Sequence, residues 1–149
     1  GCSPFRAMPA KGVERAWRGR AKKRILVAED DLEMRRLVVD ALVEDGHDVL
    51  AVGDGAALLV ELARSDRFHY RSVDLVIADV RMPICSGLEA LETLRGVGAP
   101  FPFLLMTAFG DDELHEKARR LGATLIAKPF SMARLRKTIA DALATRRTG

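Results

Sequence analysis

The chain has 149 residues, and 48% of them are hydrophobic. This length and composition fit a single globular domain with a hydrophobic core, and they exclude a coiled coil, a repeat array and a low-complexity protein. Two cysteines are too few for a disulfide framework or a zinc site, and no apolar run approaches the roughly 18 residues of a membrane span. We therefore expect a cytoplasmic protein without a membrane partner.

Positive charge is concentrated at the beginning of the chain. Residues 1–24 contain eight Lys or Arg and one acidic residue, whereas the rest contains 16 basic and 20 acidic residues. We predict that residues 1–23 form a basic, flexible arm or an expression remnant, residues 24–145 the folded domain, and residues 146–149 a polar tail or the start of a linker. The arm could contact nucleic acid or an acidic partner, but we expect no direct nucleic-acid binding by the folded domain.

Five short apolar runs follow the arm, and their starts lie 22 to 28 residues apart. Each interval leaves room for a helix, so the pattern predicts five strands alternating with five helices. Such alternation is typical of a parallel sheet with helices on both faces. The runs are Ile25–Ala28, Val49–Val52, Leu75–Ala78, Phe103–Met106 and Leu125–Ala127.

Helix signals fall between the runs and after the last one. Apolar stripes at helical spacing end at Gly46, Gly96 and Gly122, and glycine commonly follows a helix end. Asp111 and Ser131 are suitable N-caps for the last two helices. The stripes consist of Leu37, Val38, Ala41 and Leu42; Leu88, Leu91 and Leu94; Leu114, Ala118 and Leu121; and Leu135, Ile139 and Leu143.

The weakest helix signal lies at about residues 55–64. The following segment, residues 65–72, is a longer connection than the others. We expect it to be a surface loop whose Phe68 and Tyr70 fold back onto the domain.

Polar side chains follow the apolar runs directly. Asp79 ends the central run, and taken alone it would most simply cap the following turn. Glu29 and Asp30 follow the first run, Thr107 the fourth, and Lys128 the fifth. Because all strands of a parallel sheet point the same way, we expect these groups to converge at one edge, where open α/β sheets bind ligands.

The residue types at this edge suit phosphoryl transfer. The carboxylates of Glu29, Asp30 and Asp79 would repel one another unless a cation neutralised them, and a small set of oxygen ligands suits Mg²⁺. Lys128 adds an ammonium group and Thr107 a hydroxyl donor, which could stabilise the oxygens of a phosphoryl group. Asp79 would be the nucleophile and would form an acyl phosphate.

Four motifs, in this order and spacing, resemble the receiver domain of two-component response regulators over about residues 24–143. The resemblance implies a flavodoxin-like doubly wound sheet with strand order 2-1-3-4-5 and a cis peptide between Lys128 and Pro129. The motifs are Ile25-Leu-Val-Ala-Glu-Asp-Asp31, Asp79-Val-Arg-Met-Pro83 followed by Gly87, Met106-Thr-Ala108, and Lys128-Pro-Phe130.

The resemblance also implies residue roles. Asp79 would accept a phosphoryl group from a sensor histidine kinase or a phosphotransfer protein, Lys128 would bind a phosphoryl oxygen, and Thr107 would move as the switch. The chain would catalyse only its own phosphorylation and dephosphorylation, and so would not be an enzyme acting on other substrates. The implied Mg²⁺ ligands are Glu29, Asp30, Asp79 and the main-chain carbonyl of Arg81.

Output would pass through the surface of the fourth helix, fifth strand and fifth helix, to a downstream protein, a homodimer partner or a missing effector domain. Two positions depart from the family pattern. Leu125 replaces the usual switch aromatic, so we expect an atypical readout. Ser86 stands where the family commonly has an Asp that takes no part in the reaction, so we expect this difference to have little effect on function.

Two other functions share parts of this pattern. A Mg²⁺-dependent phosphohydrolase would normally carry an acid two residues after its nucleophile, where this chain has Arg81. A flavin-binding electron carrier would need a phosphate-cradling loop after the first strand, where this chain has acidic residues. Multiple turnover of a phosphate ester would favour the hydrolase, and a bound yellow cofactor the carrier.

Overall fold

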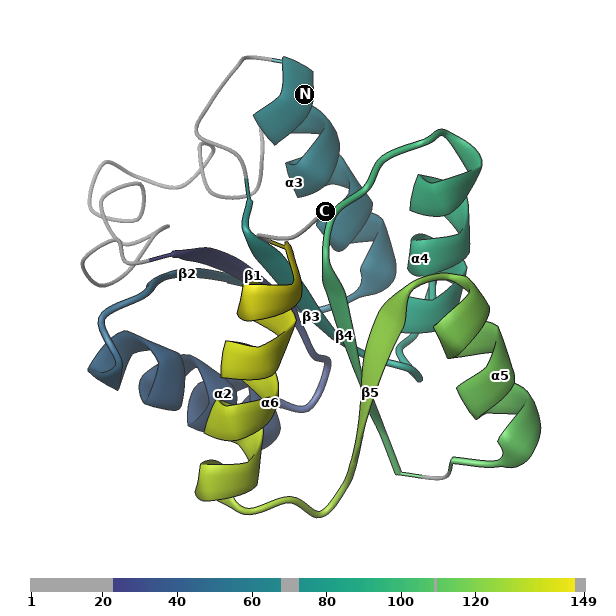
Figure 1. Ribbon diagram of the computed structural model, residues 1–149. Helices are drawn as coiled ribbons and strands as arrows, with labels where there is room; N and C mark the ends of the chain where they lie inside the picture. The colour runs from purple at the N-terminus through teal and green to yellow at the C-terminus, as the bar shows by residue number, and fades with distance from the viewer. Residues whose placement is uncertain (1–22, 68–72, 109, 147–149) are drawn as a thin grey trace.

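A computed structural model describes residues 23–67, 73–108 and 110–146, in which five strands alternate with five helices (Figure 1). The predicted arm and most of the predicted tail lie outside these residues, as do Phe68 and Tyr70. The elements are β1 (Arg24–Ala28), α2 (Leu32–Glu44), β2 (Asp48–Val52), α3 (Gly55–Arg67), β3 (Leu75–Asp79), α4 (Gly87–Gly96), β4 (Phe103–Thr107), α5 (Asp112–Arg120), β5 (Ala123–Ala127) and α6 (Met132–Arg146).

The strands form one parallel sheet in the order β2-β1-β3-β4-β5, which confirms the predicted flavodoxin-like topology. The register pairs Ala28 with Ala78, and Asp79 with Met106. The carboxyl ends of β1, β3 and β4 therefore lie side by side, and β5 follows at the edge.

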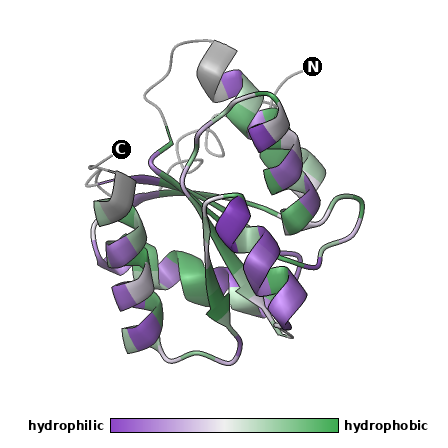
Figure 2. Ribbon diagram, turned by 45° about the vertical axis from the view of Figure 1, so that its right-hand side comes forward, coloured by the Kyte–Doolittle hydropathy of each residue, from purple (hydrophilic) through white to green (hydrophobic). Residues whose placement is uncertain are grey.

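Helices cover both faces of the sheet (Figures 1 and 2). One hydrophobic cluster joins the sheet to α3, α4 and α5, and includes Leu58, Leu91 and Ala118. A second cluster joins the other face to α2 and α6, and includes Val38 and Leu135. Because both faces are covered, β3 and β4 are buried along their whole length, which explains their unbroken apolar sequences.

The ends of several helices follow the predicted capping chemistry. The side chain of Asp111 accepts a hydrogen bond from the amide of Leu114 at 2.7 Å, and the hydroxyl of Ser131 accepts one from the amide of Arg134 at 3.0 Å. Both predicted N-caps are therefore confirmed.

Ser86 has a definite local role as the N-cap of α4. Its hydroxyl accepts a hydrogen bond from the amide of Glu89 at 3.0 Å, and the carboxylate of Glu89 accepts one from the amide of Ser86 at 2.9 Å. This reciprocal pair is a capping box. It fixes the start of α4 close to the end of β3.

Two details of the predicted helices were wrong. Helix α3 continues to Arg67, so the first three residues of the expected 65–72 loop belong to the helix. Leu37 is 46% exposed rather than part of the buried stripe of α2. The buried arc of α2 centres on Val38 and Leu42, and Leu37 precedes Val38 by about 100° around the helix, which places it just outside this arc.

Ile84, in the loop between β3 and α4, has an unfavourable backbone conformation for its side chain. Its φ is 70°, and 82% of the residue is exposed, so little burial offsets the strain. A left-handed backbone costs an L-residue about 1–2 kcal/mol. Glycine adopts a positive φ without this strain. Its greater conformational freedom in the unfolded chain, however, offsets about 0.4–1 kcal/mol of the stability gained by relieving the strain.

We expect Ile84→Gly to raise the free energy of unfolding in urea by about 0.5–1 kcal/mol. Val97→Gly is the matched control, because Val97 is also highly exposed, at 77%, but has a φ of −100°. The control should lower stability. A loss of stability in both variants would show that the left-handed conformation of Ile84 carries no strain.

Candidate active site

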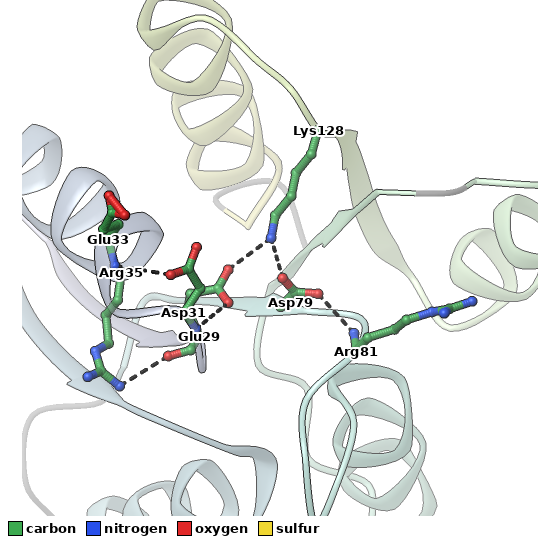
Figure 3. Close-up of polar contacts among 7 residues, drawn as sticks. All are labelled: Glu29, Asp31, Glu33, Arg35, Asp79, Arg81 and Lys128. Carbon is green, nitrogen blue, oxygen red and sulfur yellow. Dashed lines mark hydrogen bonds and ion pairs between the residues drawn. The ribbon is translucent and has the colours of Figure 1, made fainter.

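The predicted site residues follow the strand ends at the carboxyl edge of the sheet, and Figure 3 shows Glu29, Asp79 and Lys128 meeting there. Glu29 and Asp30 follow β1, Asp79 ends β3, Thr107 ends β4, and Lys128 follows β5. Two backbone hydrogen bonds fix neighbouring strand ends, from Val80 to Met106 at 2.8 Å and from Lys128 to Thr107 at 2.7 Å. Parallel pairing therefore determines which side chains meet.

Glu29 is almost completely buried, at 1% exposure, and its carboxylate is held from two sides. One oxygen accepts a hydrogen bond from the amide of Asp31 at 3.0 Å, and the other accepts one from Nζ of Lys128 at 3.0 Å. The backbone amide of Glu29 donates to the carbonyl of Val52 at 3.1 Å. The first carboxylate of the site therefore has a fixed position.

Asp79 lies between a backbone donor and an ammonium group. Its Oδ1 accepts a hydrogen bond from the main-chain amide of Arg81 at 2.9 Å, and its Oδ2 forms a close ion pair with Nζ of Lys128. The side chain of Arg81 points away from Asp79 in Figure 3. Residue 81 thus acts on Asp79 through its backbone, a contact that the sequence pattern did not reveal.

Lys128 reaches the other site residues only because its side chain is long. It follows β5, two strands away from β3, which is a separation of roughly 10 Å at normal strand spacing. Its ammonium group nevertheless contacts both Glu29 and Asp79. The peptide between Lys128 and Pro129 is cis, as the family resemblance implied.

Burial and charge shift the protonation of this cluster. Burial raises the pKa of Glu29 to about 7; the Asp31 amide and the Lys128 ammonium lower it, and the neighbouring Asp79 raises it. Burial lowers the pKa of Lys128, but the hydrogen bonds and charges of Asp79 and Glu29 raise it more, so the net shift is upward. Lys128 therefore stays protonated at neutral pH, and additional positive charge beside Glu29 would lower the pKa of its carboxyl group.

The three acidic side chains fit a small divalent cation. One oxygen from each of Glu29, Asp30 and Asp79 lies within 4.8 Å of the others. Oxygens that bind Mg²⁺ at about 2.1 Å lie at most about 4.2 Å apart, so small movements would close the group around the ion. An all-oxygen donor set also suits Mg²⁺ rather than a softer metal.

Thr107 and Leu125 lie on neighbouring strands beside this cluster. Thr107 is buried, and the side chain of Leu125 lines a cavity of about 550 Å³ between α5 and β5. The strand register pairs Leu125 with Leu105, which precedes Thr107 by two residues on β4. The cavity is therefore lined by β5, the neighbour of the strand that carries Thr107, and its other lining residues are Asp112, His115, Glu116, Ala118, Arg119 and Ala123.

No helix in the described residues has the length and apolar composition needed to cross a membrane.

Comparisons with known proteins agree with this geometry. Residues 25–140 match the family described as the response regulator receiver domain. The chain is 36% identical over 123 residues to the transcriptional regulatory protein FixJ of Bradyrhizobium diazoefficiens, covering 82% of this chain and 57% of FixJ. It is 32% identical over 117 residues to the chemotaxis protein CheY of Bacillus subtilis, covering 78% of this chain and 93% of CheY.

Solved structures show the same fold. The chemotaxis protein CheY4 of Vibrio cholerae superimposes with a TM-score of 0.70 at 27% identity, covering 82% of this chain and 99% of CheY4. The chain spans little more than half of FixJ but nearly all of the Bacillus subtilis CheY. It therefore belongs to the receiver domains of two-component response regulators, which are phosphorylation-dependent signalling switches.

Proposed function

We propose that Asp79 accepts a phosphoryl group from a sensor histidine kinase or a phosphotransfer protein in a Mg²⁺-dependent reaction. The observation that carries this proposal is the position of Asp79, which pairs with the ammonium group of Lys128 and lies beside the acidic pair Glu29 and Asp30. A carboxylate in this setting can act as a nucleophile while positive charge is available for the incoming phosphoryl oxygens.

The transfer step conserves charge and atoms. A carboxylate oxygen of Asp79 attacks phosphorus, so a P–O bond forms as the P–N bond of phosphohistidine breaks. The reacting phosphohistidine is protonated on its second ring nitrogen, so the ring leaves as neutral imidazole with the P–N bond electrons on the nitrogen that held phosphorus. Lys128 then binds an oxygen of the new acyl phosphate, and the amide of Arg81 continues to orient the Asp79 carboxyl group.

Glu29, Asp30, Asp79 and the main-chain carbonyl of Arg81 would hold Mg²⁺. The bound ion supplies positive charge that lowers the repulsion between the carboxylates and the phosphoryl oxygens. The residues of the chain contribute the fixed part of the site, because Glu29 is buried and hydrogen-bonded on both carboxylate oxygens.

The phosphoryl group would change the surface formed by α5, β5 and α6. Its oxygens would attract the hydroxyl of Thr107, and movement at the end of β4 would change the loop that leads into α5. Leu125 gives this readout an atypical form, because an aliphatic side chain beside the α5–β5 cavity has no aromatic ring to exchange between exposed and buried positions.

The chain would catalyse only its own phosphorylation and dephosphorylation. Its output would come from a downstream protein, from dimerisation through α5, β5 and α6, or from an effector domain in a longer protein. Arg81 supports the proposal that the chain does not hydrolyse other phosphate esters, because it occupies the position at which a related hydrolase would carry its proton-donating acid.

The test of the proposal is incubation of the wild-type chain with acetyl phosphate, followed by intact mass spectrometry. We expect one added phosphoryl group with Mg²⁺ and none when EDTA removes divalent ions. Repeated turnover without a phosphorylated protein would instead indicate a hydrolase. Equal phosphorylation with and without the metal would refute the Mg²⁺ requirement.

Lys128→Ala should separate phosphorylation from the response to it. The variant keeps Asp79, so we expect partial phosphorylation by acetyl phosphate. It lacks the ammonium group that would bind the phosphoryl oxygen, so phosphorylation should no longer change partner binding or dimerisation in size-exclusion chromatography. Arg36→Ala is the control, because it removes the same charge from the exposed side of α2, outside the proposed output surface. A normal response in Lys128→Ala would refute the role of Lys128.

A further inference from the structure

We propose that Arg35 is a positioning residue for the acidic pair Glu29 and Asp30, and that it acts by holding the turn between β1 and α2. This inference deepens the proposed function and rests on it, because the turn it concerns carries two of the proposed Mg²⁺ ligands. In Figure 3 the side chain of Arg35 lies on the side of Glu29 opposite Lys128 and Asp79.

The contact between Arg35 and the turn is direct. Nη1 of Arg35 donates a hydrogen bond to the main-chain carbonyl of Glu29 at 3.1 Å, and the side chain is only partly exposed. The carbonyl belongs to the peptide that joins Glu29 to Asp30. A donor on this oxygen therefore fixes the orientation of the peptide plane between the two ligands.

The Glu29 backbone is held at both of its polar groups. Its amide donates to Val52 on the neighbouring strand at 3.1 Å, and its carbonyl accepts from Arg35 on the following helix. The amide of Arg35 in turn donates to the carbonyl of Asp31 at 2.9 Å, which anchors the residue in the first turn of α2. Arg35 thus links the ligand-bearing turn to a rigid helix rather than to another loop.

Gly53 leaves the space that the guanidinium occupies. A Cβ atom added to Gly53, in the turn between β2 and α3, would lie 3.1 Å from Nη1 of Arg35. This is tighter than nine in ten Cβ contacts, so the guanidinium would have to move by a few tenths of an ångström. The glycine and the arginine therefore form one unit, and each offers an independent way to disturb the hydrogen bond to Glu29.

Charge and positioning predict opposite effects on Mg²⁺ binding. Arg35 is a cation near the proposed metal site, so it repels Mg²⁺, and removal of its charge alone should tighten binding. If Arg35 instead holds the ligands in place, its removal should weaken binding despite the loss of repulsion. The sign of the change in affinity therefore distinguishes the two accounts.

The experiment measures Mg²⁺ binding by isothermal titration calorimetry. The proteins compared are the wild-type chain, Arg35→Met and Arg35→Lys. We expect Arg35→Met to bind Mg²⁺ more weakly, by a factor on the order of ten, as is usual when a residue that supports metal ligands is removed. Arg35→Lys keeps the charge and one donor, so it should recover part of the affinity. Unchanged or tighter binding by Arg35→Met would overturn the proposal.

Gly53→Ala provides a second test that leaves Arg35 in place. We expect a smaller loss of affinity in the same direction, and no further loss when Gly53→Ala is added to Arg35→Met, because both act through one hydrogen bond. Additive losses would overturn the coupling of the two residues. If Arg35→Met does not fold, the Arg35→Lys titration decides alone, because this variant keeps the charge, and an affinity equal to that of the wild-type chain would refute the proposal.

Two controls complete the design. Arg36→Met removes the same charge from the exposed side of α2, and it should leave the Mg²⁺ affinity nearly unchanged. Hydrogen exchange in EDTA gives a metal-free measurement: the amide of Asp31, which donates to Glu29, should exchange faster in Arg35→Met than in Arg36→Met. Equal exchange in both would count against the proposal. Failure of the wild-type chain to bind Mg²⁺ would instead refute the proposed function itself.

Discussion

Asp79→Asn is expected to remove all phosphorylation by acetyl phosphate in the presence of Mg²⁺. The substitution changes very little in shape, but it replaces a charged carboxylate with a neutral amide that is a far weaker nucleophile. It also removes one of the three carboxylates among the four ligands proposed for Mg²⁺. The effect should be the complete loss of the added mass rather than a reduced rate.

The surroundings of Asp79 explain why an amide cannot replace the carboxylate. Both of its oxygens accept from donors, the amide of Arg81 on one side and the ammonium group of Lys128 on the other. An Asn side chain has only one acceptor oxygen, so its NH₂ group would face one of these donors. Circular dichroism should accompany the mass measurement to show that the variant is folded.

Asp40→Asn is the matched control for this prediction. Asp40 lies on the exposed side of α2 and loses the same charge by the same change. We expect normal phosphorylation of the control. If Asp79→Asn still gains a phosphoryl group while the control is phosphorylated normally, another residue must be the acceptor.

Gly87→Ala is expected to damage the fold and the site together. Gly87 begins α4 and donates its amide to the carbonyl of Val80 at 3.1 Å. A Cβ atom at this position would overlap the carbonyl oxygen of Asp79 and lie 3.0 Å from its carbonyl carbon. These are backbone atoms of a fully buried strand, so they cannot move aside as a flexible side chain would.

We expect Gly87→Ala to lower the free energy of unfolding by about 1–3 kcal/mol, the usual cost of overpacking, and to slow phosphorylation because Asp79 is displaced. Urea unfolding and the acetyl phosphate assay measure the two effects. Gly96→Ala is a strict control in the same helix, because a Cβ atom there meets nothing within 4 Å. It should raise stability by up to about 1 kcal/mol, through better helix propensity. A stable, normally phosphorylated Gly87→Ala chain would contradict the steric argument.

Neighbouring residues decide most of the local structure, so the sequence indicates it well. The unbroken apolar run at residues 75–78 predicts a strand buried on both faces, and β3 has this burial. The capping roles of Asp111 and Ser131 follow from side-chain chemistry over three residues, and both are present. The candidate site residues are indicated in the same way, because each follows the end of an apolar run.

Features that depend on the packing of one element on another were harder to predict. Leu37 fits the helical stripe of α2 but lies just outside the face that meets the sheet. The end of α3 at Arg67 lies beyond the expected residue 64, because the sequence of residues 65–67 contains no strong stop signal. Neither detail changes the site, since both lie away from the carboxyl edge of the sheet.

The linear pattern is enough to predict the succession of strands and helices and the residue types at each strand end, because these depend on contacts between residues close in the chain. The three-dimensional fold was needed to show that Lys128 contacts Asp79 and Glu29, which lie 49 and 99 positions away from it. It also decided that burial raises the pKa of Glu29, that Arg35 holds the Glu29 carbonyl, and that Gly87 must lack a side chain. The physical reason is that desolvation, ion pairing and steric fit depend on distances through space, which parallel strand pairing sets and a linear pattern does not contain.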